Sequence, residues 1–347
     1  PNPTFGDATE EATGDTEIVM MPAPSAASEE DAAPDRPGFQ FAVAVRHPGV
    51  HGRPRVYPSP IALRPGRTWR PFPNGVIHQL AMSPDGELVA AIAESGELRL
   101  WSLADGSEVP LETQREPESF SEVGFGRDGR IAVWDGNLVT RWEPDGSAAG
   151  FVHQPMAGLE GFEASERQFC LWTDRPVFLD LRGDHHGTID AIDDDPVSRS
   201  GLSPDGGTLA IGSEGGRICA YRLADFSRVW LTQTDLGEIR ALAVSPKGRS
   251  TAAGGREAVV VLDAEGHEIR RLPAHDGSVS GLVWIGGDRF LVSAGQDRIL
   301  RVWCGRSGAL LIEEVFPAPI RSVVTSSRWL AVATADRIVL LGIERTR

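Results

Sequence analysis

A short turn signal recurs along the chain at a nearly constant interval, and this interval constrains the fold more than any other feature. Ser83-Pro84-Asp85-Gly86 returns as Gly126-Arg127-Asp128-Gly129, Ser203-Pro204-Asp205-Gly206 and Ser245-Pro246-Lys247-Gly248, with weaker versions at 165–167, 285–288 and 326–328. Neighbouring copies begin 38 to 43 residues apart. Pro presets φ for the first central turn position, and Asp and Gly suit the next ones, so each copy predicts a tight turn between antiparallel strands. Seven copies predict seven repeats of one small unit.

Each unit shows the same order of strand-like segments. An alternating strand precedes the turn, as at 239–244, and a second strand follows it, as at 88–93. A third strand often ends in an aromatic residue, as at 299–303, and another tight turn leads to a weaker fourth strand. Short strands separated by frequent turns, without a sustained helical stripe, indicate an all-β chain. We therefore predict a seven-bladed β-propeller of four-stranded antiparallel blades over residues 61–347, with units near 77–115, 120–153, 159–191, 197–234, 239–274, 279–316 and 320–345.

The last unit has three obvious strands before the chain ends, so its fourth strand must come from elsewhere to cover the open sheet edge. We expect Arg67–Phe72 to supply it and to close the ring. Residues 39–60 are interpreted as an irregular lead-in with one strand at Phe39–Arg46. Residues 1–38 carry nine acidic side chains and one basic one, and their Ala- and Pro-rich composition predicts a disordered tail or linker.

The sixth unit resembles the WD-repeat propeller family, and the resemblance extends in weaker form over residues 61–345. It rests on Ala274-His275-Asp276 ahead of the first strand, then Ser293-Ala294-Gly295-Gln296-Asp297, then a strand that ends at Trp303. The resemblance implies a buried hydrogen-bonded tetrad of His275, Ser293, Asp297 and Trp303 that locks the blade. It is not interpreted as a Ser–His–Asp triad, because a triad needs an exposed nucleophile and an oxyanion hole.

The other six units depart from the family pattern. Ser95, Gly136 and Gly215 stand where the sixth unit has Asp297, and the matching histidine is missing from all six. These units are expected to depend on apolar packing and turn geometry. Propellers of the TolB type, peptidase-associated propellers, seven-bladed lactonases and quinoproteins are alternative placements that leave the architecture unchanged.

A propeller offers a wide face around a central funnel, and residues at the start of each blade's first strand line the rim of that face. Alignment of the units gives equivalent rim positions at His78, Ser121, Glu160, Ser198, Arg240, Ser280 and Arg321. Five of them, His78, Glu160, Arg240, Ser280 and Arg321, are the candidate partner-binding residues. Arg240 and Arg321 are the preferred contacts, because a guanidinium supplies forked donors at a low desolvation cost.

The charge balance narrows the choice of partner. The net charge is −15, which repels phosphate backbones and anionic lipid, so neither nucleic acid nor membrane is expected. The basic residues include a single lysine, Lys247, a bias that fits a GC-rich bacterial genome. Three scattered cysteines suit a reducing cytoplasm rather than a disulfide framework.

These observations favour a protein-binding platform without catalysis of its own. It would be a scaffold or sensor module of a larger bacterial regulatory, signalling or defence protein or complex, binding protein partners or another domain of the same polypeptide. No cofactor or metal is expected: His185 and His186 diverge on an extended chain, and the acidic run 193–195 is interpreted as a solvated loop, with weak calcium or magnesium binding as the alternative. A small-molecule ligand is disfavoured. Two alternatives are a propeller enzyme of the lactonase or related hydrolase type and a structural subunit of a multiprotein complex.

Overall fold

The computed structural model describes residues 43–45, 55–57, 60–112, 120, 122–126, 128–135, 138–153, 161–164, 168–172, 177–180, 185–188, 192, 195–273 and 275–345. The chain divides into two units, of which residues 61–345 form one, and 1–60 with 346–347 form the other. In the smaller unit, β1 (Val43–Val45) pairs antiparallel with β2 (Arg55–Tyr57). The expected strand at 39–46 therefore contains β1, and the expected disorder of 1–38 lies outside the described residues.

The strands of the larger unit form seven four-stranded antiparallel sheets. The first three are β4 (Ile77–Met82) to β7 (Glu108–Val109), β8 (Glu122–Phe125) to β11 (Ala148–His153), and β12 (Gly161–Ala164) to β15 (His185–Thr188). The next three are β16 (Val197–Leu202) to β19 (Ser227–Gln233), β20 (Ala241–Val244) to β23 (Glu268–Leu272), and β24 (Val279–Ile285) to β27 (Leu310–Val315). The seventh contains β28 (Ser322–Thr325), β29 (Trp329–Ala333), β30 (Ile338–Arg345) and β3 (Ile61–Trp69).

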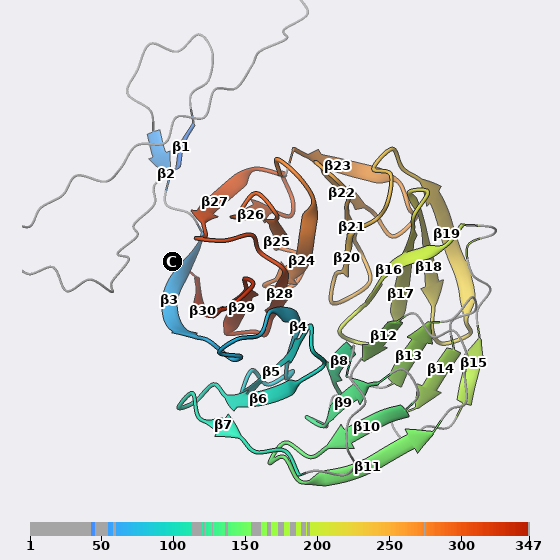
Figure 1. Ribbon diagram of the computed structural model, residues 1–347. Coiled ribbons are helices and arrows are strands. Elements are labelled where there is room, and N and C mark those ends of the chain that lie inside the picture. The colour runs from blue at the N-terminus through green and yellow to red at the C-terminus, as the bar shows by residue number, and fades with distance from the viewer. Residues whose placement is uncertain are drawn as a thin grey trace, which may run out of the picture. The chain divides into compact units, whose positions relative to one another are not determined.

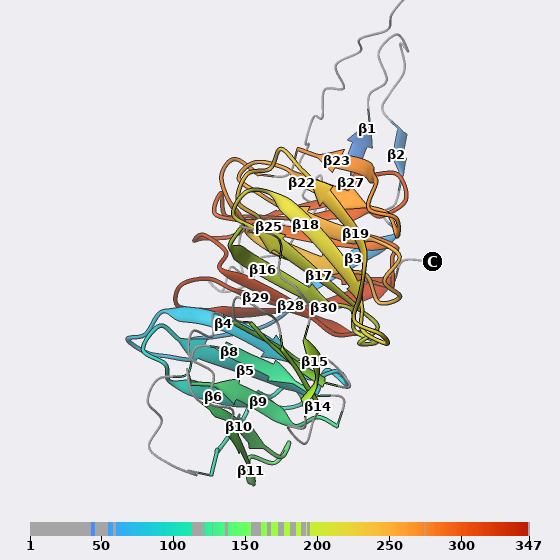
Figure 2. The same cartoon turned by 90° about the vertical axis from the view of Figure 1, so that its right-hand side faces the viewer.

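The second and third strands of the first six sheets are β5 (Leu88–Ala93), β6 (Leu98–Ser102), β9 (Ile131–Trp134), β10 (Leu138–Trp142), β13 (Gln168–Trp172), β14 (Val177–Asp180), β17 (Thr208–Ser213), β18 (Arg217–Arg222), β21 (Thr251–Gly254), β22 (Val259–Leu262), β25 (Phe290–Gly295) and β26 (Ile299–Cys304). Seen from one end, the sheets are arranged around a centre, with the first strand of each nearest to it and the fourth farthest away (Figure 1). Figure 2 shows the unit from the side, where the strands of each sheet lie next to one another. The chain is an all-β propeller with four-stranded antiparallel blades.

The strand that joins the beginning of this unit to its end is longer than expected and starts earlier. β3 pairs with β30 from Ile61 opposite Arg345 to Trp69 opposite Ile338, whereas the sequence predicted this strand at 67–72. Pro65 and Gly66 resemble a turn in the sequence, but here they sit at a register shift in an outer strand, where a missing N–H is tolerated. A Cβ at Gly66 would lie 2.6 Å from the Leu340 carbonyl oxygen, so only glycine fits this close approach.

The recurrent turn owes its sequence to hydrogen bonds that close between its own residues. The Ser83 hydroxyl donates to the Asp85 carboxylate at 2.5 Å and accepts the Leu88 N–H at 2.9 Å. Asp85 also accepts the N–H of Glu87 at 2.9 Å, while Gly86 adopts a φ of 73°. The copy at Ser203 closes in the same way, with a Ser203–Asp205 distance of 2.7 Å. The turn therefore satisfies its backbone locally, as expected for Ser, Asp and Gly at these positions.

The core consists of apolar layers between neighbouring sheets. Between the sixth and seventh sheets, Val292, Leu300 and Val302 pack against Leu330 and Val332, and all five are fully buried. Each such side chain contributes roughly 1.5–3 kcal/mol relative to an exposed one. Further clusters of this kind join the seventh sheet to the first, the first to the second, the fourth to the fifth and the fifth to the sixth. These layers hold the strands that surround the centre in fixed positions.

Candidate functional site

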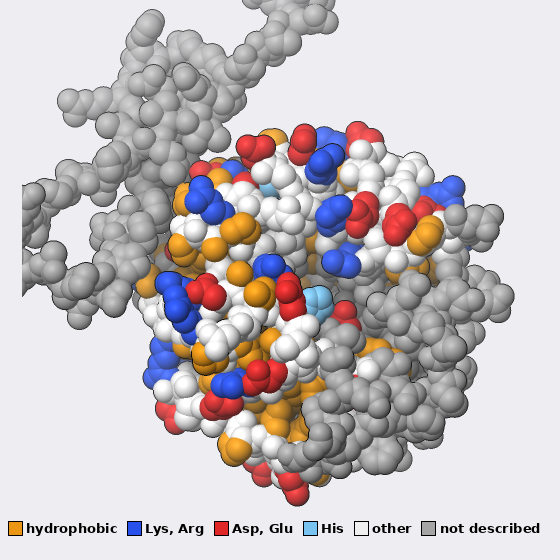
Figure 3. All heavy atoms as spheres, in the orientation of Figure 1, with side chains coloured by type: hydrophobic (Ala, Val, Ile, Leu, Met, Phe, Trp, Pro, Cys, Tyr) orange, Lys and Arg blue, Asp and Glu red, His pale blue; other side chains and the backbone are white. Residues whose placement is uncertain are grey.

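A cavity of about 570 Å³ lies at the centre of the larger unit and is called the channel here. Among the residues whose side chains are described, its walls come from the first strands β4, β8, β16, β20, β24 and β28 and the residues just before them. The end at which these strands begin is called the upper face. Figure 3 shows charged side chains and one histidine gathered around the centre of the molecule on the face it displays. The channel combines a polar mouth with fixed walls, which is suited to binding.

Four of the five predicted rim residues line this one cavity. They are His78, Arg240, Ser280 and Arg321, and each lies at the start of the first strand of a different sheet. Glu160, the fifth, lies outside the described residues. The sequence alignment of the units therefore identified residues that lie around one cavity although they are up to 243 positions apart in the chain.

Arg240 and Arg321 are both exposed, and each holds a carboxylate. The Arg240 guanidinium lies 2.6 Å from Glu238, and the Arg321 guanidinium lies 2.5 Å from Glu94 on the β5–β6 hairpin. The side chains of all four residues are 41–52% exposed. Exposed pairs of this kind contribute about 0–1 kcal/mol to stability, so a partner can exchange them at little cost.

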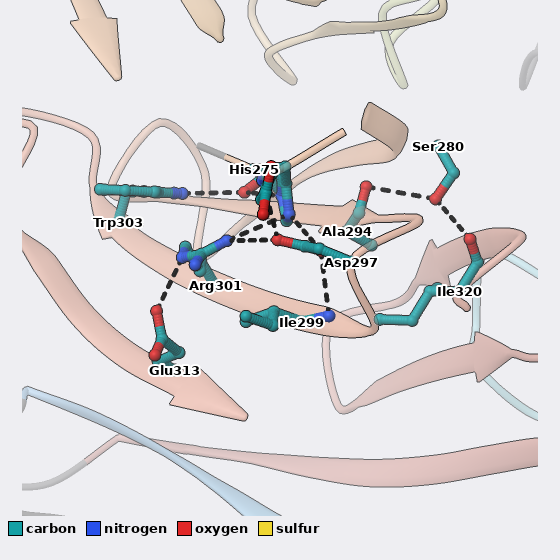
Figure 4. Close-up of polar contacts among 11 residues, drawn as sticks. His275, Ser280, Ala294, Asp297, Ile299, Arg301, Trp303, Glu313 and Ile320 are labelled. Carbon is teal, nitrogen blue, oxygen red and sulfur yellow. Dashed lines mark hydrogen bonds and ion pairs between the residues drawn. The ribbon is translucent and has the colours of Figure 1, made fainter. Parts of the chain in front are cut away.

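Ser280 has a different position from the one expected of a contact residue. Its hydroxyl lies 2.6 Å from the carbonyl oxygen of Ile320, just before the first strand of the next sheet, and 3.2 Å from that of Ala294 (Figure 4). Ser198 repeats the arrangement, with its hydroxyl 2.8 Å from the carbonyl oxygen of Ile239. Both hydroxyls therefore bind neighbouring sheets to each other, which leaves the recognition of a partner to other side chains on the rim.

Three polar residues of the channel were missed by the sequence alignment. Gln79, Glu122 and Arg199 line the channel one position beyond the aligned rim residues. For Gln79 and Arg199 the cause is an irregularity in strand register, which shifts between Ile77 and Gln79 and again between Val197 and Arg199. Such bulges redirect side chains locally. The available signal was the polar residue itself, since Glu122 and Arg199 interrupt strands that are otherwise mostly apolar or small.

The surroundings of the channel shift the pKa values of two of its side chains, His78 and Glu122. Desolvation lowers the pKa of His78, and Arg199 and Arg321 lower it further, against the opposing effect of Glu94. Burial raises the pKa of Glu122 to about 7, although the Gln79 side chain and the Arg199 charge oppose the shift. Both effects favour the neutral form of the group.

The sixth sheet contains the tetrad that the WD resemblance implied (Figure 4). His275 Nδ1 lies 2.9 Å from the Asp297 carboxylate, and His275 Nε2 lies 2.9 Å from the Ser293 hydroxyl. The Trp303 indole N–H donates to the same hydroxyl at 2.9 Å. A neutral imidazole with its proton on Nδ1 satisfies every one of these bonds, because Nε2 then accepts the Ser293 proton. Ser293 is fully buried, so its hydroxyl has no access to a substrate.

Two further charged groups extend the tetrad toward the fourth strand. Arg301 donates to Asp297 at 3.1 Å and to Glu313 at 2.8 Å. Burial alone would raise the pKa of Asp297, but hydrogen bonds from His275, Ile299 and Arg301 outweigh it and hold this pKa below its usual value. Burial lowers the pKa of His275, with Asp297 opposing the shift. The tetrad is therefore a neutral histidine oriented by an ionised carboxylate.

The fourth sheet lacks this tetrad and uses a different carboxylate. Asp195, in the segment before β16, accepts the Ser213 hydroxyl at 2.6 Å and the Gly215 N–H at 2.9 Å. The sequence interpretation of 193–195 as a solvated loop is wrong for Asp195, whose side chain is only 12% exposed. Asp193, Asp194 and the side chains of His185 and His186 lie outside the described residues. Within the described part of the chain, no group of three or more His, Cys, Asp or Glu side chains could hold a metal ion.

No helix in the described ranges has both the length and the apolar content that a bilayer crossing requires.

Comparison with known proteins connects this architecture to a family. Residues 266–304 match the family model described as WD domain, G-beta repeat, and this stretch contains the whole tetrad. Echinoderm microtubule-associated protein-like 1 of Mus musculus is 24% identical over 252 residues, which cover 66% of this chain and 30% of the relative. The protein of the same name from Homo sapiens is 25% identical over 244 residues, covering 66% and 29%. The chain thus aligns with less than a third of the length of these relatives.

The repeat match, the relatives and the sheet arrangement agree with the resemblance seen in the sequence. The tetrad lies inside the matched stretch, and the strand order of the described sheets follows the blade pattern of the repeats. The chain is a WD-repeat β-propeller.

Proposed function

We propose that this chain is a protein-interaction platform that binds its partner through the upper face, at the mouth of the channel. The single observation that carries the proposal is the convergence of His78, Arg199, Arg240 and Arg321 from separate sheets on one cavity. Arginine is enriched where interfaces concentrate their binding energy. The exposed ion pairs of Arg240 and Arg321 can be exchanged for pairs with a partner at little cost.

The platform is a seven-bladed ring closed by β3, and it has no catalysis of its own. Support comes from the pairing of β3 with β30 and from the contacts that link the first strands from β4 around to β28 and back to β4. Closure matters because it fixes the spacing of the rim residues. A chain that begins at residue 70, tested against one that begins at residue 61, is expected to unfold with a lower midpoint and a broader transition. Equal midpoints would refute closure by β3.

The cellular setting follows from composition. The acidic, Ala- and Pro-rich segment 1–38 and the single lysine among the basic residues favour a cytoplasmic module of a larger bacterial regulatory, signalling or defence protein or complex. The partner is a protein or another domain of the same polypeptide, and the net charge of −15 argues against nucleic acid and anionic membranes. Because the relatives are named as microtubule-associated, co-sedimentation with microtubules tests one specific partner.

The test compares two double charge reversals at opposite ends of the same two strands. Arg240→Glu/Arg321→Glu changes the start of β20 and β28, whereas Arg249→Glu/Arg328→Glu changes exposed arginines in the turns that follow these strands. Partner capture from the native host is expected to fall at least tenfold for the first pair and to remain unchanged for the second. Equal capture by both pairs would show that the upper face is not the interface.

A further inference from the structure

Arg199 occupies the mouth of the channel in a fixed conformation. Its Nε donates to the carbonyl oxygen of Arg240 at 3.0 Å, and its Nη1 donates to the carbonyl oxygen of Ser198 at 2.7 Å. The side chain is exposed and lines the channel. Two backbone contacts therefore hold the guanidinium in place before any ligand arrives, which lowers the entropy cost of binding.

Arg199 differs from its two neighbours on the rim in the groups that pair with its charge. Arg240 and Arg321 each have a carboxylate within 2.6 Å, whereas both hydrogen-bond partners of Arg199 are neutral carbonyls. In the part of the chain that the structure describes, no carboxylate lies within 4.0 Å of the Arg199 guanidinium, the distance at which an ion pair is counted. A guanidinium has five N–H donors, and Arg199 uses two of them here.

The groups around Arg199 do little to cancel its charge at neutral pH. Burial raises the pKa of Glu122 to about 7, so a large fraction of this carboxyl is protonated there. Desolvation keeps His78 mostly uncharged by lowering its pKa. The mouth of the channel therefore presents a cation that is oriented and only partly compensated.

We propose that Arg199 recognises an acidic side chain of the partner, an aspartate or glutamate on a peptide that enters the channel from the upper face. This rests on the proposed function and names the chemistry of its partner. The free N–H groups of Arg199 can bind a carboxylate through two parallel hydrogen bonds, the arrangement in which a guanidinium binds most strongly. The channel volume of about 570 Å³ accommodates a few residues of an extended chain.

The test uses three synthetic hexapeptides with the full chain, and binding is measured by isothermal titration calorimetry. Ac-(Gly-Glu)₃-NH₂ carries acidic side chains, Ac-(Gly-Gln)₃-NH₂ is its neutral match, and Ac-(Gly-Gln)₃-OH carries only a terminal carboxylate. The acidic peptide is expected to bind, and Arg199→Gln is expected to weaken it at least tenfold. Arg199→Lys should retain part of the affinity, and Arg249→Gln, in the turn after β20, should retain all of it.

The outcomes separate this proposal from the proposed function. Equal binding of the acidic and neutral peptides, binding of the free-terminus peptide alone, no binding of the acidic peptide, or full binding by Arg199→Gln would each overturn acidic recognition. A thermal melt of Arg199→Gln shows whether the variant is folded. If Arg240→Glu/Arg321→Glu loses the native partner while Arg199→Gln keeps it, the proposal that the upper face is the interface stands. Only the proposal that Arg199 recognises the partner is then refuted.

Discussion

The hydroxyl of Ser280 lies 2.6 Å from the carbonyl oxygen of Ile320, a residue forty positions further along the chain and just before the first strand of the next sheet. Ser198 makes the same contact with Ile239, 41 positions away. One repeat length separates donor and acceptor in both cases. The strand irregularity at each serine is therefore also the place where neighbouring sheets are joined around the channel.

Removal of this contact should destabilise the protein without affecting the rest of the rim. Ser280→Ala is expected to lower the free energy of unfolding by about 1 kcal/mol, because it leaves a carbonyl without its donor. Urea denaturation followed by tryptophan fluorescence measures the change. Ser327→Ala, at an exposed turn position, is the control and should shift the midpoint negligibly. A loss confined to Ser327→Ala, or no loss in Ser280→Ala, contradicts the assignment.

The tetrad should make stability depend on pH through His275. Burial lowers the pKa of this imidazole in the folded state, so the unfolded chain binds the proton more tightly. The contribution of His275 to the free energy of unfolding is therefore fully present above the unfolded pKa of about 6.5. It is lost as the pH falls toward the folded pKa, with a slope of at most about 1.4 kcal/mol per pH unit.

His275→Gln tests this dependence, with His267→Gln at an exposed histidine as the control. The difference in unfolding free energy between wild type and His275→Gln is expected to shrink as the pH falls from 7.5 to 5. The difference for His267→Gln should stay small at every pH. A pH-independent difference for His275→Gln would show that the histidine is not buried in its neutral form.

Glu122 should make the free energy of unfolding depend on pH in the opposite direction. Burial raises its folded pKa to about 7, so the native state favours the neutral acid. Its effect on stability is absent below the unfolded pKa of about 4.5, becomes increasingly destabilising as the pH rises from there to the folded pKa of about 7, and is constant above it. Glu122→Gln is expected to gain on the order of 2 kcal/mol over wild type at pH 8 and little at pH 5. Glu87→Gln, at an exposed turn carboxyl, provides the comparison, and an equal gain at both pH values for Glu122→Gln would contradict the buried acid.

Much of the fold could be predicted because its signals are local. The turn at Ser83 closes between residues five positions apart, and the tetrad residues lie within a single repeat, so sequence spacing alone identifies them. β3 was harder to place, because Pro65 and Gly66 imitate a turn and only the close approach to Leu340 explains them. That contact joins the two ends of the unit and has no local signal.

The site was predicted in part, for a related reason. Alignment of the repeats identified Arg240 and Arg321, whose strands start without a bulge at the rim. It missed Arg199, because the bulge at Ser198 moves the polar side chain by one position. It also missed the role of Asp195, since a carboxylate that caps a neighbouring hairpin resembles a solvated one in sequence. A bulge and a cap depend on pairing across strands, which a repeat alignment does not contain.

Hydrogen–deuterium exchange of the chain, free and bound to its captured partner, tests the binding face most directly. Peptides that cover 77–79, 197–199, 239–241 and 320–322 are expected to gain protection in the complex, because they form the mouth of the channel. Peptides that cover the turns at 83–87 and 245–250, at the other end of the same strands, should be unchanged. Protection confined to those turns would contradict the upper face as the partner-binding surface.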